Sequence, residues 1–139
     1  MIITKEREYA VRAVSALSSK ETTSARYICE STNISIDFMH KILRKLERNG
    51  IVRSIRGVNG GYRLVKELNK ISLLDILLAV DENMFIHECL KPDYVCEFSD
   101  KKYELVQTAF QNVQSVMLTE FRKKTMDMLV KPSDEGPAA

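Results

Sequence analysis

The first half of the chain consists of short amphipathic segments separated by polar breaks. Apolar residues recur at steps of three and four after Thr4, which predicts a first helix with Thr4 as its N-cap. Ser24 is placed to cap a short second helix, and Ser35 to cap a third that ends at the stop signal Asn49-Gly50. Two helices joined by a tight turn are typical of a DNA-binding helix-turn-helix.

The expected third helix has an apolar side and a polar side. Phe38, Ile42 and Leu46, helped by Met39 and Leu43, recur at helical spacing, so this side is expected to pack in the core. The other side carries long, mostly cationic side chains that suit base edges or phosphates. A solvated helix would more often alternate Glu with Lys, so the pattern favours a recognition helix. The polar side is formed by Asp37, His40, Lys41, Arg44 and Arg48.

Two expected strands, residues 51–56 and 61–65, flank the tetrapeptide Gly57-Val58-Asn59-Gly60. Glycine permits positive φ and lets the backbone approach another surface closely, so this segment predicts a hairpin with a slim tip. Arg56 stands just before the tip, where arginine suits a narrow groove of strong negative potential. A helix-turn-helix followed by a basic hairpin predicts a mainly α, winged-helix fold with a two-stranded wing.

The second half predicts a short apolar helix and a long one. Ser72 is placed to cap LLDILLAV, and a long helix is expected from residue 100 to about 129. One small domain cannot cover a helix of roughly 45 Å, so its apolar stripe predicts pairing with a second subunit. The expected dimer seam is Tyr103, Val106, Phe110, Val113 and Met117.

Composition narrows the function. The formal charge is +2 over 139 residues, but residues 41–66 hold eight basic residues and one acid, which is typical of a polyanion-binding surface. A solvated basic face is the alternative reading of the charge alone. No apolar run is long enough to cross a membrane, and three irregularly spaced cysteines favour a reducing cytoplasm over a disulfide scaffold. We find no nucleophile motif, phosphate loop or paired carboxylates, so an enzyme is not expected.

The segment LERNGIVRSIRGVNGGYRLVK resembles the signature of the Rrf-two family of winged-helix transcription regulators. ITKEREYAVRAVSAL resembles the family's first helix, and ISIDFMHKILRKL its recognition helix. The resemblance implies a homodimer on a partly palindromic operator of double-stranded DNA, with the third helix in the major groove and the wing in the minor groove. Tyr62 and Leu64 are expected to pack the wing onto the core. The implied DNA contacts are Ser35, Asp37, His40, Lys41, Arg44, Arg53, Arg56 and Asn59.

The resemblance also implies a sensor loop over residues 81–99. In the family this loop holds three cysteines that bind an iron–sulfur cluster, whereas here it contains only Cys89 and Cys96, with His87 nearby. Glu8 occupies the position where some relatives place a carboxylate ligand. A [2Fe–2S] centre would therefore use Cys89 and Cys96 with Glu8 and His87.

Other readings of the loop remain open. Arg12 stands where one redox-sensing relative has a histidine ligand, which weakens the analogy for Glu8. The loop cysteines could instead sense thiol oxidation directly, or the loop could hold no cofactor. Regulation through a protein partner is the remaining alternative, and Cys29 is expected to be a buried structural cysteine. The predicted organisation is a DNA-binding domain at 1–80, a sensor loop at 81–99, a dimerisation helix at 100–130 and a disordered tail at 131–139.

Overall fold

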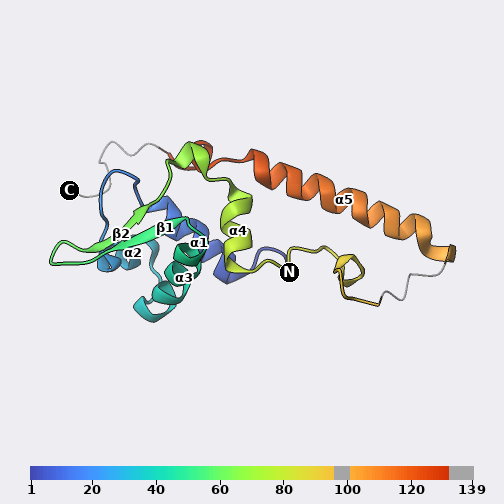
Figure 1. Cartoon of the computed structure of the whole chain (residues 1–139), viewed down its shortest axis with the longest axis horizontal. Helices are drawn as coiled ribbons and strands as arrows, with labels where there is room; N and C mark the ends of the chain where they lie inside the picture. Colours follow the sequence, from blue (N-terminus) through green and yellow to red (C-terminus); the bar gives the residue numbers. More distant parts are fainter. Residues whose placement is uncertain (96–100, 132–139) are drawn as a thin grey trace.

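A computed structural model describes residues 1–95 and 101–131 of the chain. It confirms the predicted winged helix-turn-helix with a long C-terminal helix, which Figure 1 shows extending away from the winged part. Three single-turn helices, η1 (Leu68–Lys70), η2 (Glu88–Leu90) and η3 (Lys101–Tyr103), lie in the connections. The main elements are α1 (Lys5–Ser15), α2 (Ala25–Thr32), α3 (Ile36–Arg48), β1 (Val52–Ile55), β2 (Gly61–Leu64), α4 (Leu73–Val80), α5 (Glu104–Lys123) and α6 (Met126–Leu129).

Side-chain caps fix where three of the helices begin, as their sequences predict. The Thr4 hydroxyl accepts a hydrogen bond from the N–H of Arg7 (3.2 Å), and the Ser24 hydroxyl accepts one from Tyr27 (3.1 Å). Ser72 forms a reciprocal capping box with Asp75 at the start of α4. These bonds satisfy main-chain donors that a helix leaves free in its first turn.

The core of the winged part is the shared apolar interior of α1, α2, α3, β1, β2 and α4. Burying side chains of this size removes their apolar surface from water and is the main favourable term in folding. The antiparallel wing joins this core through its base, because Val52 and Leu64 are paired and both are buried. The largest fully buried side chains include Val14, Ile28, Met39, Ile42, Leu43, Leu46 and Ile76.

The segment expected to form one helix over 100–129 is divided into α5 and α6. Lys124 is extended, and its carbonyl accepts a hydrogen bond from the N–H of Leu73 (2.7 Å). Two residues later, the N–H of Met126 donates to the carbonyl of Ile71 (2.9 Å), and the Met126 side chain is fully buried. The helix therefore stops where the main chain pairs with the segment before α4 and inserts a side chain into the core.

Arg7 is a buried charged residue that ties α1 to the end of α4. Its side chain is 3% exposed, and it has no carboxylate partner among residues 1–95 and 101–131. Main-chain oxygens surround it instead: Nε donates to Leu77 (3.2 Å), and Nη2 donates to Asp81 (2.5 Å) and Asn83 (3.3 Å). Nη1 donates to the carbonyl of Ile2 (2.6 Å). A helix C-terminus carries partial negative charge, so these carbonyls stabilise the buried cation.

Replacing Arg7 by Met should lower the free energy of unfolding by roughly 2–4 kcal/mol, because buried carbonyls lose a charged donor. Urea denaturation followed by far-UV circular dichroism measures this change. Arg26→Met is the matched control, since Arg26 is 88% exposed and forms a surface ion pair with Glu30. The control should change stability by less than about 1 kcal/mol. Equal losses in the two variants would contradict the role given to Arg7.

Candidate nucleic-acid interface

Helix α3 presents a polar row on the side opposite to the core. Met39, Ile42, Leu43 and Leu46 are each 0% exposed, which fixes the rotation of the helix. The opposite side is solvent-exposed over more than two turns and carries three cations and one carboxylate, as the sequence predicts. These exposed residues are Asp37, Lys41, Arg44 and Arg48.

Two residues of α3 are placed differently from the sequence prediction. Phe38, expected in the core, is 36% exposed and sets its ring edge-on against Tyr9, with centroids 5.5 Å apart. The Lys41 ammonium lies 5.7 Å from the same ring, an arrangement suited to cation–π attraction. His40, expected among the free polar residues, is half-buried, and its Nδ1 lies 3.4 Å from the hydroxyl of Tyr62 on β2. Phe38 thus lies at one edge of the α3 core face and His40 at the other.

The wing is held against α3 and against the connection before α2. The Glu47 carboxylate accepts hydrogen bonds from the main-chain N–H (3.2 Å) and hydroxyl (2.8 Å) of Ser54 on β1. Tyr62 on β2 exchanges two main-chain hydrogen bonds with Thr23, of 2.9 and 2.8 Å. The predicted wing contacts remain exposed, while these bonds fix the strands that carry them. They are Arg53 on β1, and Arg56 and Asn59 in the turn.

The glycines of the wing are required by backbone conformation at Gly57 and by close contacts within the chain at Gly60 and Gly61. Gly57 has φ +116°, a conformation that side chains disfavour, and it forms the turn. A Cβ added at Gly60 would lie 2.4 Å from the carbonyl oxygen of Ile55, and one at Gly61 would lie 2.1 Å from that of Thr23. The sequence predicted that a glycine would let the backbone approach another surface closely. At Gly61 that surface is the connection between α1 and α2 of the same chain.

Two side chains near α3 have raised pKa values. Burial, and then the negative charge of Glu47, raise the pKa of Tyr62, while Arg44 opposes them. Tyr62 therefore stays a neutral phenol beside His40. Burial, and then Glu30, raise the pKa of Cys29, so its half-buried thiol carries little thiolate. Cys29, expected to be buried, is half-buried and packs against the core as a free cysteine.

The C-terminal half of α3 is bonded to the end of α4. The Lys45 ammonium donates to the carbonyl of Val80 (3.2 Å) and pairs with the carboxylate of Glu6 on α1 at 2.7 Å. The Asn49 side-chain amide donates to the carbonyl of Ala79 (3.3 Å). Helix α3 and its C-cap therefore donate to the same group of α4 carbonyls as Arg7.

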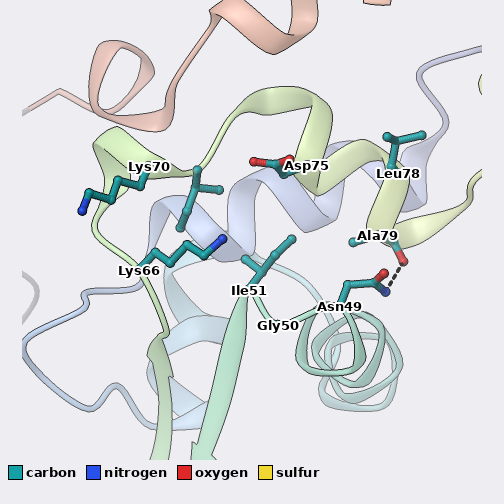
Figure 2. Close-up of a pocket in the computed structure, with 9 residues that line it drawn as sticks. Asn49, Gly50, Ile51, Lys66, Lys70, Asp75, Leu78 and Ala79 are labelled. Carbon is teal, nitrogen blue, oxygen red and sulfur yellow. Dashed lines mark hydrogen bonds between the residues drawn. The ribbon is translucent and has the colours of Figure 1, made fainter.

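An open hollow lies behind the C-terminus of α3, and Figure 2 shows the residues that line it. Its volume is about 240 Å³, and its floor includes Ile51 between α3 and β1. The Asp75 carboxylate already accepts the N–H of Ser72. The ends of Lys66 and Lys70 point in different directions, Lys66 towards Ile51 and Lys70 outwards. Its lining includes neither the first turn of α3 nor the wing tip, so the hollow adds no residue to the candidate interface.

The candidate metal ligands do not converge in the part of the chain that the structure describes. The Glu8 carboxylate pairs with the Arg12 guanidinium at 2.5 Å. His87 Nδ1 accepts the N–H of Cys89 (3.1 Å), and Cys89 is disulfide-bonded. Cys96 lies outside the described residues. Within residues 1–95 and 101–131, no three His, Cys, Asp or Glu side chains are grouped to hold a metal ion. These donors, as placed, do not fit an iron–sulfur cluster.

The segment that contains His87 packs on α5 of its own chain. The buried Gln114 side chain donates to the carbonyl of Met84 (2.6 Å) and accepts the N–H of Ile86 (2.9 Å). The His87 ring stacks on Phe110, with centroids 5.2 Å apart. Sequence reasoning did not single out Gln114, because an amide on a helix gives no local sign of what it will bond.

The predicted dimer seam divides into covered and uncovered residues. Phe110 and Met117 are half-buried within the chain, Phe110 against His87, whereas Tyr103, Val106 and Val113 are 36, 42 and 57% exposed. The apolar side chains left uncovered therefore follow a stripe rotated from the predicted seam. That stripe consists of Leu105, Val106, Ala109, Val113 and Val116.

Known proteins resemble the chain over most of its length. The family described as Rrf2, iron-dependent transcriptional regulator, matches residues 3–132. A Haemophilus influenzae HTH-type transcriptional regulator is 34% identical over 65% of this chain, and the match covers 62% of that protein's length. The HTH-type transcriptional regulator IscR of Pectobacterium atrosepticum is 31% identical over 94% of this chain and 79% of its own.

The solved structures agree on the fold. A transcriptional regulator from Listeria innocua superimposes with a TM-score of 0.75, at 23% identity, over 96% of this chain and 89% of its own. In the described residues, no helix combines the length and apolar character needed to cross a membrane. The family match extends through the winged helix and α5 together. The chain therefore belongs to the Rrf2 family of transcription regulators.

Proposed function

We propose that the protein is a homodimeric repressor that binds a partly palindromic operator. DNA binding itself follows from its membership in a family of helix-turn-helix transcription regulators. In this proposal residues 1–80 read the DNA, α3 enters the major groove and the wing reaches the minor groove. The exposed polar row of α3, backed by a fully buried apolar face, is the observation that carries the proposal.

The chemistry of the row suits a duplex. Lys41 and Arg44 are exposed cations one turn apart, and arginine can donate two hydrogen bonds to a guanine in the major groove. The Ser35 hydroxyl makes no capping bond, which leaves it able to donate to a phosphate. The first turn of α3 adds free main-chain N–H groups and the positive end of the helix dipole. Arg56 would lie in the minor groove, where narrowing increases the negative potential.

Replacing Arg56 by Ala should weaken operator binding by roughly 1–3 kcal/mol and relax sequence preference, because Arg56 reads a base or a narrow groove. Fluorescence anisotropy with the operator and with sequence-altered duplexes measures both effects. Lys70→Gln is the control, since it removes one positive charge outside the wing and α3. The same loss on every duplex would mean that Arg56 only contacts phosphate.

The uncovered stripe of α5 supports a dimer in this proposal. Leu105 and Val116 are 85 and 64% exposed, and an apolar stripe of this length on one helix suits a matching helix. A two-fold dimer would place two α3 helices about one DNA turn apart, roughly 34 Å, which a palindromic operator requires.

Replacing Val113 by Glu should raise the dimer dissociation constant at least about tenfold, because the new carboxylate would be buried in the apolar contact. Light scattering coupled to size-exclusion chromatography measures the mass of the particle across a dilution series. Ser115→Glu adds the same charge at an exposed position on another side of α5, and should leave the dimer intact. A dimer that tolerates both changes would place the subunit contact elsewhere.

A second candidate concerns the signal, which we infer enters through residues 81–99. The family description names iron, but a cluster that uses Cys89, Cys96, Glu8 and His87 would require the Cys89 disulfide to be reduced and Glu8 to leave Arg12. The disulfide state of Cys89 supports thiol oxidation instead, because such a pair forms and breaks with the surrounding redox potential. A regulatory protein partner would need neither.

Protein purified without oxygen should separate these signals. A cluster would give iron in the protein and a coloured absorption spectrum, and both would disappear in Cys89→Ser. Thiol oxidation would give colourless protein whose operator affinity changes with dithiothreitol, and Cys89→Ser would abolish that response. A colourless, iron-free dimer that binds its operator contradicts the cluster. If, in addition, the operator affinity of this dimer does not change with dithiothreitol, both the cluster and the thiol-oxidation hypotheses are contradicted.

A further inference from the structure

Ile36 is an apolar side chain on the part of α3 that would enter the DNA. It is the first residue of α3 and is 44% exposed. Ile36 lies outside the core, which α3 builds from Met39, Ile42, Leu43 and Leu46. A branched side chain has no advantage in helix propensity at such a place, and nearly half of the surface of Ile36 stays exposed to water.

The position of Ile36 gives it access to base edges. The first residues of a recognition helix are those that reach the bases in a helix-turn-helix complex. Ile36 precedes Asp37 of the polar row, and it lies one turn before His40 on the side of α3 that faces the wing. Exposed apolar residues scattered over a surface are common, but this one lies within the predicted reading surface.

Its chemistry restricts what it can read. An isoleucine side chain neither donates nor accepts a hydrogen bond, so it cannot distinguish bases by their donor and acceptor patterns. In the major groove, thymine alone presents an apolar group, its C5-methyl. We propose that Ile36 is a specificity-determining residue that packs on a thymine C5-methyl in each operator half-site. This inference rests on the proposed DNA-binding function and specifies one base that is recognised in each half-site.

The size of the effect follows from burying one methyl group. Removing that methyl, by replacing thymine with uracil, leaves every base pair and hydrogen bond of the duplex unchanged. The wild-type protein should lose about fourfold in affinity per contacted half-site, the value expected for one buried carbon. Ile36→Ala should bind the thymine operator more weakly and should show little further loss on the uracil duplex.

The test uses the full-length protein and a duplex obtained by in vitro selection from a random pool. Each thymine of the selected half-site is replaced in turn by deoxyuridine, and anisotropy gives the affinity of the wild type and of Ile36→Ala. Val65→Ala is the matched control, because Val65 is 49% exposed, similar to Ile36, but follows β2 outside the reading surface. Circular dichroism checks that the variants keep their helices.

We expect one thymine position at which replacement by uracil lowers affinity, a loss called the uracil penalty. This penalty should be present in the wild type and in Val65→Ala but absent in Ile36→Ala. Ile36→Val, which keeps two methyl groups, should retain part of the penalty. A uracil penalty that persists in Ile36→Ala, or no penalty at any thymine, would overturn the inference while DNA binding stands. Failure to select any duplex would instead reject the proposed function itself.

Discussion

The main-chain carbonyls at the end of α4 need hydrogen-bond donors, and the way they are satisfied joins the winged part together. Arg7 from α1 and Lys45 and Asn49 from α3 all donate to them. Cations at a helix C-terminus are favourable, and here one of them is buried without any carboxylate partner among the described residues. Because one set of acceptors binds donors from two helices, α1, α3 and α4 cannot shift independently.

These hydrogen-bonded carbonyls at the end of α4 adjoin the segment through which the proposed signal would enter. Asp81 and Asn83, whose carbonyls accept from Arg7, begin the segment that continues to His87 and Cys89. A rearrangement that pulled this segment from α5 would therefore act directly on the carbonyls that bind Arg7 of α1, next to the Val80 carbonyl that binds Lys45 of α3. The physical requirement is two arrangements of one bonded network, each favoured by a different state of the segment.

Local patterns were enough to predict much of the fold, because helix caps, periodicity and turn glycines act over a few residues. The exposed polar row of α3 followed from the same patterns, whereas the full set of expected DNA contacts was implied by the family resemblance and stays a prediction. Phe38 was misplaced because it lies at the edge of the apolar face, where burial depends on neighbours from another helix such as Tyr9. The break before Met126 and the burial of Arg7 depend on residues some fifty to seventy positions away, which no short pattern records.

Because the chain breaks between α5 and α6, α5 is held near its C-terminal end and its far end can move when that end tilts. Its base is held where Leu118 and Phe121 pack against α4 and where Lys124 pairs with Leu73. A straight helix of this length is about 30 Å long, so a tilt of about 10° at the base moves the far end by about 5 Å. In the proposed dimer, a small repacking at the α4 contact would thus become a large change in the separation of the two subunits. Affinity for an operator would then fall, because its half-site spacing is fixed and the two reading helices would no longer match it.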